Sequence, residues 1–208
     1  NNTEKIRAHI RAIASETPGH VAVFTPSYAL LDEIVGQELW HGRRVMMEES
    51  GWSKQRIDSL LRDLEMSRSA GEKILLGGVF SAKLGEGVDY KHNLLDAVIC
   101  IGLPLPPPSS ELSARKEYYE ERFGKSKSYR WAVQQPAVNA LMQAMGRPIR
   151  KMGDRAFILL LEERLFMPQF KRLLPKNLNI LTVTNEETTK RHVRRFFKRH
   201  PEPAIGDE

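Results

Sequence analysis

The sequence predicts an α/β fold in which a mostly parallel sheet is covered by helices on both faces. Short apolar runs, such as Val21–Phe24 and Val98–Leu103, alternate with longer segments in which apolar residues recur at helical spacing. Such continuous apolar runs are typical of strands that are buried on both sides. With 208 residues, 41% of them hydrophobic, the chain is long enough for one domain with a sizeable core and too short for two comfortable ones.

The first half of the chain reads as helices alternating with strands. Ile6, Ile10 and Ile13 lie at helical spacing before Thr17-Pro18-Gly19, a stretch that ends a helix. The next units are expected to be strands at Val21–Phe24, Arg44–Met47 and Ile74–Phe80, a helix from Tyr28 to Trp40, and a helix through Ile57, Leu60, Leu61 and Leu64 that ends before Gly71.

The second half continues the alternation after a proline-rich break at Pro104–Pro108, which excludes strand and helix interior. The expected strands are Val98–Leu103, Ala156–Leu161 and Ile180–Val183, and the expected helices are Glu111–Phe123, a central helix from Pro136 to Gly153, and Glu186–Arg199. We expect 1–185 to form the globular domain, with 186–208 adding a basic helix and a loose tail at Pro201–Glu208.

Composition narrows the class of protein. A net charge of +6 and a pI near 9.5 favour a polyanionic partner. The single cysteine, Cys100, lies in an apolar run, so this chain alone cannot build a disulfide framework or an iron–sulfur cluster. No apolar run approaches the roughly 20 residues of a membrane span, so we expect no membrane partner and a cytoplasmic or nuclear location. A first residue, Asn1, that is not Met suggests a piece of a longer protein.

The stretch Gln143–Arg150 is the most informative part of the sequence. In a helix, Gln143, Gly146, Arg147 and Arg150 would share one stripe. Two guanidinium groups on one stripe can bind phosphate oxygens in bidentate fashion. Gly146 lowers helix stability by roughly 1 kcal/mol against Ala, which suggests that another group approaches the backbone there. Spacing alone is equally compatible with a solvated basic face.

The loop Ser81–Tyr90 is the second chemical element. Gly85 and Gly87 allow backbone amides to turn toward an anion, while Lys83 and Asp89 offer a phosphate partner and a ribose hydroxyl acceptor. Taken alone, the same residues also describe an ordinary turn from a strand into a helix. Because parallel strands share one carboxyl edge, this loop, the segment Thr25–Tyr28 and the central helix are expected to converge there.

The chain has phosphate-binding arginines without a cradle for a triphosphate. Gly124-Lys125-Ser126 resembles the end of a P-loop, but Tyr119 stands where that motif requires its first glycine. This combination indicates arginine fingers that serve a site held mainly by another domain.

Three motifs in register resemble those of superfamily 2 helicases. Gln143–Arg150 is similar to motif VI (Q-x-x-G-R-x-x-R), Gly85–Tyr90 to motif V in the form typical of the XPD/DinG group, and Thr25–Tyr28 to motif IV. The order and spacing over about 19–197 are most similar to the XPD members of that group. The resemblance implies the second RecA-like motor domain, a three-layer α/β fold, of a 5′-to-3′ DNA helicase of nucleotide excision repair.

The resemblance also implies what is absent and what each motif residue does. The first motor domain, with its Walker motifs and a four-cysteine insertion for a 4Fe-4S cluster, would lie outside this chain, which alone should hydrolyse nothing. ATP and Mg²⁺ would be shared between the two domains. Arg147 and Arg150 match arginine fingers, Gln143 matches the residue that orients the γ-phosphate or the attacking water, and the nucleotide-facing residues would be Gly85, Glu86, Gly87, Asp89 and Gly146.

One residue departs from the expected helix. Pro148 lies inside motif VI, and a proline in a helix interior costs about 3 kcal/mol or more. The helix is therefore expected to bend or end there, which makes the position of Arg150 less secure than that of Arg147.

The DNA contacts follow from the resemblance and from residue type. Ser27, Tyr28 and Lys83 would track the backbone of a single strand, and Tyr129-Arg130-Trp131 interleaves rings with a cation as a stacking platform does. Trp131 could equally anchor a helix in the core. The basic terminal helix could bind DNA, a repair-complex protein or only solvent.

A second hypothesis stays open. The chain could be a non-catalytic module that holds single-stranded nucleic acid or a protein partner, with its arginines on backbone phosphates. Such a module predicts salt-sensitive binding without nucleotide dependence.

Overall fold

A parallel sheet forms the centre of the molecule, and the computed structural model describes residues 2–91, 93–151 and 153–201. Its five described strands have the order β2-β3-β1-β4-β5, and every adjacent pair is parallel. The strands are β1 (Val21–Thr25), β2 (Arg44–Met47), β3 (Ile74–Val79), β4 (Ala97–Ile101) and β5 (Phe157–Leu161). The predicted parallel α/β sheet is confirmed, whereas the expected loose tail lies, from residue 202 on, outside the described residues.

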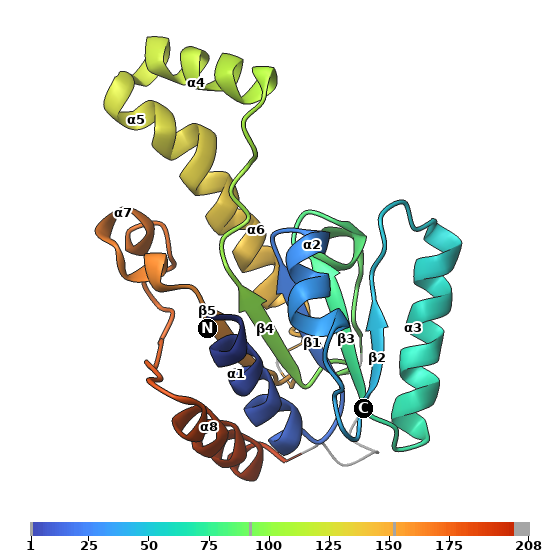
Figure 1. Ribbon diagram of the computed structural model, residues 1–208. Helices are drawn as coiled ribbons and strands as arrows, with labels where there is room; N and C mark the ends of the chain where they lie inside the picture. The colour runs from blue at the N-terminus through green and yellow to red at the C-terminus, as the bar shows by residue number, and fades with distance from the viewer. Residues whose placement is uncertain (1, 92, 152, 202–208) are drawn as a thin grey trace.

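Helices cover both faces of this sheet (Figure 1). The helical segments are α1 (Asn2–Glu16), α2 (Tyr28–Leu31), π-helical η1 (Asp32–Gly36), α3 (Lys54–Ser69), π-helical η2 (Lys83–Gly87), α4 (Ser110–Phe123), α5 (Lys125–Tyr129), π-helical η3 (Arg130–Gln134), α6 (Gln135–Gly146), 3-10 helical η4 (Glu163–Phe166), α7 (Pro168–Lys171) and α8 (Glu186–Arg199). Side-chain caps begin α2, α3, α4 and α8, at Ser27, Ser53, Ser109 and Asn185 respectively.

The strands separate two apolar cores because successive side chains point to opposite faces. On one face, Val21 and Val23 of β1 pack with apolar residues of α1, α2, η1 and α8. On the other face, Ala22 and Phe24 pack with α3, α6 and the segment that follows β3. The fold is therefore a three-layer sandwich in which α6 lies directly against the sheet.

Two predicted elements are wrong. The helix predicted to reach Trp40 ends with η1 at Gly36, and Trp40 folds back so that its indole N–H donates to the Val35 carbonyl at 3.0 Å. The strand predicted at Ile180–Val183 lies outside the sheet, with Ile180 and Leu181 exposed by 44% and 68%. β5 is the last strand of the sheet, and within the described chain no strand pairs with its outer edge, so this apolar run adds nothing to the sheet.

The central helix differs from the prediction at both ends. Its helical run begins at Lys125, passes through η3 and continues as α6, so Pro136 lies near the start of α6 but inside the run. The π-helical turn lies where the proline ring would otherwise crowd the preceding turn. The run ends at Gly146 rather than Gly153, because Pro148 cannot donate to the Ala144 carbonyl, which instead accepts from Arg147 N–H at 3.3 Å.

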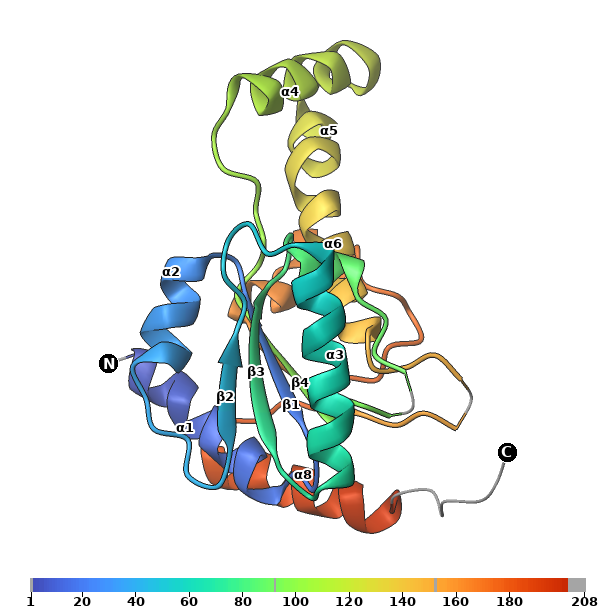
Figure 2. The same cartoon turned by 90° about the vertical axis from the view of Figure 1, so that its right-hand side faces the viewer.

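An arm projects from the carboxyl edge of the sheet. The chain leaves β4, crosses the proline-rich segment, and forms α4 and α5 away from the body, as Figures 1 and 2 show. Leu112, Ala132 and Val133 form a small core of their own, and Ser128 Oγ donates to the Lys116 carbonyl at 3.0 Å. The return path of the arm is the helical run that ends beside Arg147.

A polar network closes the opposite, amino edge of the sheet. His20 is fully buried, its Nε2 lying 2.8 Å from the Leu64 carbonyl while its Nδ1 accepts from Ile74 N–H at 3.1 Å. Asp96, also buried, pairs with Arg68 at 2.6 Å. These groups belong to the scaffold and lie away from the loops at the carboxyl edge.

Candidate functional site at the carboxyl edge

The π-helical turn η2 is fixed by close packing against the end of β3. A Cβ added to Gly85 would lie 2.2 Å from the Phe80 carbonyl oxygen and 2.6 Å from that of Val79. Only glycine lets the turn approach these carbonyls without a clash. A Cβ at Gly87, by contrast, would meet open space, so the two glycines of this loop have different roles.

Arg147 binds the backbone of this turn with its whole guanidinium group. Its Nε donates to the Gly85 carbonyl at 2.8 Å, one terminal nitrogen donates to the Val88 carbonyl at 3.1 Å, and the other donates to the Glu86 carbonyl. Partial burial and the nearby Arg150 charge lower the pKa of Arg147. The structure thus joins motifs V and VI through one side chain.

Arg150 lies on the irregular segment after α6 and forms an ion pair with Asp89. The Arg150 Nε to Asp89 Oδ1 distance is 2.7 Å, and both side chains are largely exposed. Asp154 supports this segment by accepting from the backbone N–H groups of Arg150 and Lys151, at 2.6 and 2.8 Å. As Pro148 suggested, Arg150 does not share the helical stripe of Arg147.

The other motif VI residues face outward. Gln143 is exposed on α6, and a Cβ added at Gly146 would meet nothing within 4 Å. The suggestion that a group approaches this glycine therefore finds no such group within the described chain. The open space beside Gly146 would admit a group from another chain or domain.

The three residues predicted to track a strand lie at the carboxyl ends of β1 and β3. Ser27 caps α2 by accepting from Leu30 N–H at 3.3 Å, and Tyr28 is half-buried. Lys83 is exposed and donates its ammonium group to the Trp52 carbonyl. The edge of the sheet thus brings Ser27, Tyr28 and Lys83 near the same loop system, as expected from the strand order.

Tyr129, Arg130 and Trp131 lie elsewhere, on the arm. Tyr129 and Trp131 are 48% and 39% exposed, so Trp131 does not anchor the core. Lys116 lies over the Tyr129 ring and Arg130 over the Trp131 ring, at 5.5 and 5.3 Å from the ring centroids. Further rings continue the surface along α4, with centroid separations of 5.6 to 6.4 Å through Tyr118, Tyr119, Phe123 and Trp131.

Sequence reasoning missed Glu48, which directly follows β2. Its side chain is 3% exposed, and its two carboxylate oxygens accept from Val79 N–H and Leu84 N–H, each at 3.1 Å. Burial raises the pKa of Glu48, and the hydrogen bonds from the backbone oppose that rise. The only sequence signal was a carboxylate placed immediately after a strand that ends at the carboxyl edge.

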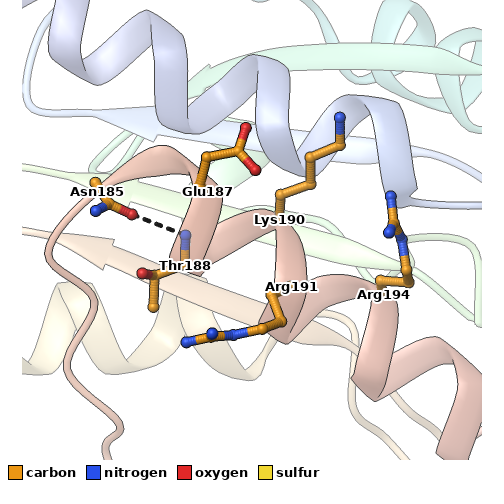
Figure 3. A pocket seen from close by; sticks show the side chains of 6 residues that line it. All are labelled: Asn185, Glu187, Thr188, Lys190, Arg191 and Arg194. Atoms are coloured by element: carbon orange, nitrogen blue, oxygen red, sulfur yellow. Dashed lines mark hydrogen bonds between the residues drawn. The ribbon is translucent and has the colours of Figure 1, made fainter.

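A hollow in the surface lies on α8, away from these motifs (Figure 3). It is lined by Asn185, Glu187, Thr188, Lys190, Arg191 and Arg194. Arg194 is engaged by Glu16 of α1 at 2.9 and 2.8 Å. Part of the basic face of α8 is thus used to attach the helix to the body.

The described residues lack two kinds of feature, a membrane-spanning helix and a cluster of metal ligands. Within 2–91, 93–151 and 153–201, none of the helices combines the length and apolar character that a membrane span requires. The same residues contain no cluster of three or more His, Cys, Asp or Glu side chains suited to a metal ion.

Comparison with known proteins gives a consistent result. The helicase C-terminal domain family matches residues 10–180. The ATP-dependent DNA helicase XPD of Sulfolobus acidocaldarius is 27% identical over 167 residues, which cover 79% of this chain and 28% of that protein. The ATP-dependent DNA helicase CHL1 of Meyerozyma guilliermondii is 29% identical, over 74% of this chain and 20% of that protein.

Solved structures agree. A structure entitled XPD helicase superposes with a TM-score of 0.65 and 25% identity, over 82% of this chain and 30% of that one. The C-terminal domain of Saccharomyces cerevisiae Dbp5, 13% identical with a TM-score of 0.52, shares the fold alone. The chain spans between a fifth and a third of the curated relatives described above.

Proposed function

The chain belongs to the helicase C-terminal domain family and has its RecA-like α/β fold, and we propose from this premise that it is the second motor domain of an ATP-dependent DNA helicase. The observation that carries the proposal is the contact of Arg147 and Arg150 with the loop Gly85–Asp89 at the carboxyl edge of the sheet. Ligands of open parallel sheets bind at that edge.

The two arginines are proposed to have different tasks. Arg147 uses all of its guanidinium nitrogens on backbone carbonyls, which suits a residue that holds the loop beside the nucleotide. Arg150 is exposed and held by one exposed carboxylate, a pair worth roughly 0 to 1 kcal/mol. Arg150 is therefore the guanidinium that can turn at little cost toward a γ-phosphate from a facing domain.

The residues present fit one side of a nucleotide site. Open space beside Gly146 and an exposed Gln143 leave room for phosphate oxygens and water, and Asp89 would accept from a ribose hydroxyl once Arg150 turns away. ATP would supply the γ-phosphoryl group. The arginines would neutralise the negative charge that develops on its oxygens as the bond to ADP breaks. Ligands for Mg²⁺ would come from the first motor domain.

DNA is the proposed polyanion. Ser27, Tyr28 and Lys83 would bind backbone phosphates at the carboxyl edge, while Tyr129, Arg130 and Trp131 would stack bases on the arm. The accessible rings and the neighbouring cations support this use of the arm. Sulfolobus XPD and Meyerozyma CHL1 are named DNA helicases, which supports DNA as the substrate.

Finer features of the whole protein belong to the same proposal. They are 5′-to-3′ polarity, a role in nucleotide excision repair, contacts with repair-complex proteins and a cytoplasmic or nuclear location. A 4Fe-4S cluster would need cysteines from outside this chain, because Cys100 is buried. The division into a motor domain, 1–185, and an added helix, 186–208, also remains a proposal; α8 packs on α1 through buried Val193.

The test compares arginine variants in the complete protein that contains this chain. Arg150→Ala is expected to lower DNA-stimulated ATP hydrolysis by roughly 10³-fold or more, and Arg147→Ala is expected to lower it comparably by releasing the loop. Steady-state hydrolysis with saturating single-stranded DNA measures both. Arg195→Ala, which removes an exposed arginine of α8, is the matched control and should retain its rate.

Full activity in the Arg150 and Arg147 variants would overturn the motor assignment. The alternative, a module that only holds single-stranded nucleic acid, predicts instead that both variants weaken binding and that binding is salt-sensitive but indifferent to ATP. Titration of a labelled single strand at several salt concentrations, with and without ATP, separates these outcomes.

A further inference from the structure

Glu48 is a buried carboxylate that the proposed mechanism leaves without a task. It follows β2, and its backbone N–H extends the β2–β3 ladder by donating to the Gly77 carbonyl at 2.8 Å. The positive charge of Lys83 acts on its carboxylate, although the Lys83 ammonium group donates to the Trp52 carbonyl. A buried charge is costly to desolvate unless its lone pairs are satisfied.

Backbone amides on both sides of one bend satisfy this carboxylate. One oxygen accepts from Val79 N–H, at the end of β3, and the other accepts from Leu84 N–H, inside η2. The chain turns between these two residues, where Ala82 N–H donates to the Val79 carbonyl at 3.1 Å. The carboxylate therefore joins the last strand residue to the first turn of the motif V loop.

Tyr90 holds the next peptide group, which carries the Leu84 carbonyl. Its ring is fully buried, and its hydroxyl donates to the Leu84 carbonyl at 3.3 Å. Arg147 then binds the carbonyls of Gly85, Glu86 and Val88. Glu48 thus accepts from the amides at the entrance of the turn, and Arg147 donates to the carbonyls at its exit.

We propose that Glu48 is a positioning residue, which fixes the turn Lys83–Gly87 so that Arg147 finds its three carbonyls and the phosphate-facing edge is formed before any ligand arrives. The inference rests on the proposed function for its catalytic consequence. It does not rest on that function for its structural content, which concerns only this chain. The role needs a carboxylate, because each of its two oxygens accepts a hydrogen bond from a different backbone N–H group.

The direct test is amide hydrogen exchange on this chain. Glu48→Gln keeps the size of the side chain but presents an NH₂ group to one of the two N–H donors. Exchange at Val79 and Leu84 is expected to quicken at least tenfold, while exchange in β1 is unchanged. Glu49→Gln removes the same charge from the exposed neighbouring residue and should change neither. Unchanged exchange at Leu84 in the Glu48 variant would overturn the inference.

Tyr90→Phe guards against a Glu48 variant that fails to fold. It keeps the buried ring, removes only the hydroxyl contact to Leu84, and should quicken exchange at Leu84 and in η2 without affecting Val79. Slower or unchanged amide exchange in η2 would contradict a turn in which side chains hold both the N–H and the carbonyl of Leu84.

The catalytic consequence is measured in the complete protein. Glu48→Gln is expected to lower the kcat of DNA-stimulated hydrolysis by roughly 10- to 100-fold, the usual effect of a misplaced catalytic group, with the KM for ATP changed less than threefold. In a double-mutant cycle with Arg147→Lys, the losses should be less than additive, because both residues hold one turn. Fully additive losses would overturn the link to Arg147.

The two proposals fail separately. Fast exchange at Leu84 without any loss of hydrolysis, in a protein whose Arg150→Ala variant is inactive, would overturn the catalytic role of Glu48 alone. Normal hydrolysis in the Arg150 variant would overturn the motor assignment and leave the exchange result as the measure of Glu48.

Discussion

Single residues at the carboxyl edge carry unequal constraints, and the two glycines of the loop give the clearest contrast. Gly85→Ala would place a methyl group 2.2 Å from the Phe80 carbonyl. The turn must then move, which is expected to cost about 1 to 3 kcal/mol of unfolding free energy, as other overpacking substitutions do, and to displace the carbonyls that Arg147 binds. Denaturant unfolding of this chain measures the first effect.

Gly87→Ala is the matched control for that prediction. A Cβ at this position meets nothing within 4 Å, so its unfolding free energy should stay within about 0.5 kcal/mol of the parent value. Equal losses in the two variants would show that close packing is not what requires Gly85.

His20 predicts how stability depends on pH. Burial, the largest cause, lowers its pKa below the ordinary 6.5, and in the neutral ring Nδ1 accepts from Ile74 N–H. The unfolded chain therefore binds this proton at higher pH than the folded chain does. Stability is full above pH 6.5 and is lost as the pH falls from there toward the lower, folded-state pKa.

The measurement is the unfolding free energy between pH 7.5 and 5. His20→Gln, whose amide can donate and accept but does not titrate, should flatten the fall. His41→Gln, at an exposed site, should leave the fall unchanged. His9, whose pKa burial also lowers, and Glu16 and Asp63, whose pKa values hydrogen bonds from Arg194 and Arg44 lower, contribute to the slope that remains. An unchanged slope in the His20 variant would contradict the prediction.

At the scale of elements, the arm is the part most open to a partner. Trp131→Ala is expected to weaken single-strand binding by roughly 1 to 3 kcal/mol, the usual value of one stacked base, because Trp131 ends a series of accessible rings. Fluorescence anisotropy of a labelled oligonucleotide measures it.

Leu39→Ala controls for the loss of exposed apolar surface, since Leu39 is 81% exposed and far from the arm in sequence. Both variants should unfold at the parent temperature. Equal binding by the Trp131 variant and the parent would remove the arm from the DNA path.

The sequence predicted those elements whose signal is local. Apolar runs revealed β1 and β4, and helical spacing revealed α3 and α8. The π-helical turns η2 and η3 were not predictable, because they depend on local packing around Gly85 and Pro136 that no periodicity encodes. The apolar residues before Trp40 predict that the helix includes it. In the structure its buried indole N–H instead donates to the Val35 carbonyl of η1.

The candidate site was predictable as a set of residues and not as a set of bonds. Motif spacing selected Gly85, Asp89, Arg147 and Arg150, and the structure brings them together. The sequence could not predict that Arg147 binds main-chain carbonyls, because every residue carries such a carbonyl. Glu48 escaped notice for the same reason: its partners are two amide groups.

Across the whole molecule, the two edges of the sheet have different chemistry. Buried and half-buried polar groups fill the amino edge. Burial lowers the pKa of half-buried Arg43 to about 10, and its guanidinium group donates to the carbonyls of Ala14, Thr17 and Gly19. The carboxyl edge carries the exposed cations and open glycines. Accessible cations and glycines thus lie at the edge where ligands of this fold bind.

The unbroken helical run from Lys125 to Gly146 has a mechanical consequence. Trp131 lies on this run and Arg147 is the first residue after it, so the two are separated along the helix axis by roughly 24 Å at 1.5 Å per residue. Because a continuous helix changes little in length, a displacement of the Trp131 ring along the helix axis would also displace the Arg147 guanidinium group. Contact with a DNA strand at Trp131 and the hold of Arg147 on the loop Gly85–Val88 would then be mechanically coupled, and the π-helical turn beside Pro136 is the place where the helical run can bend.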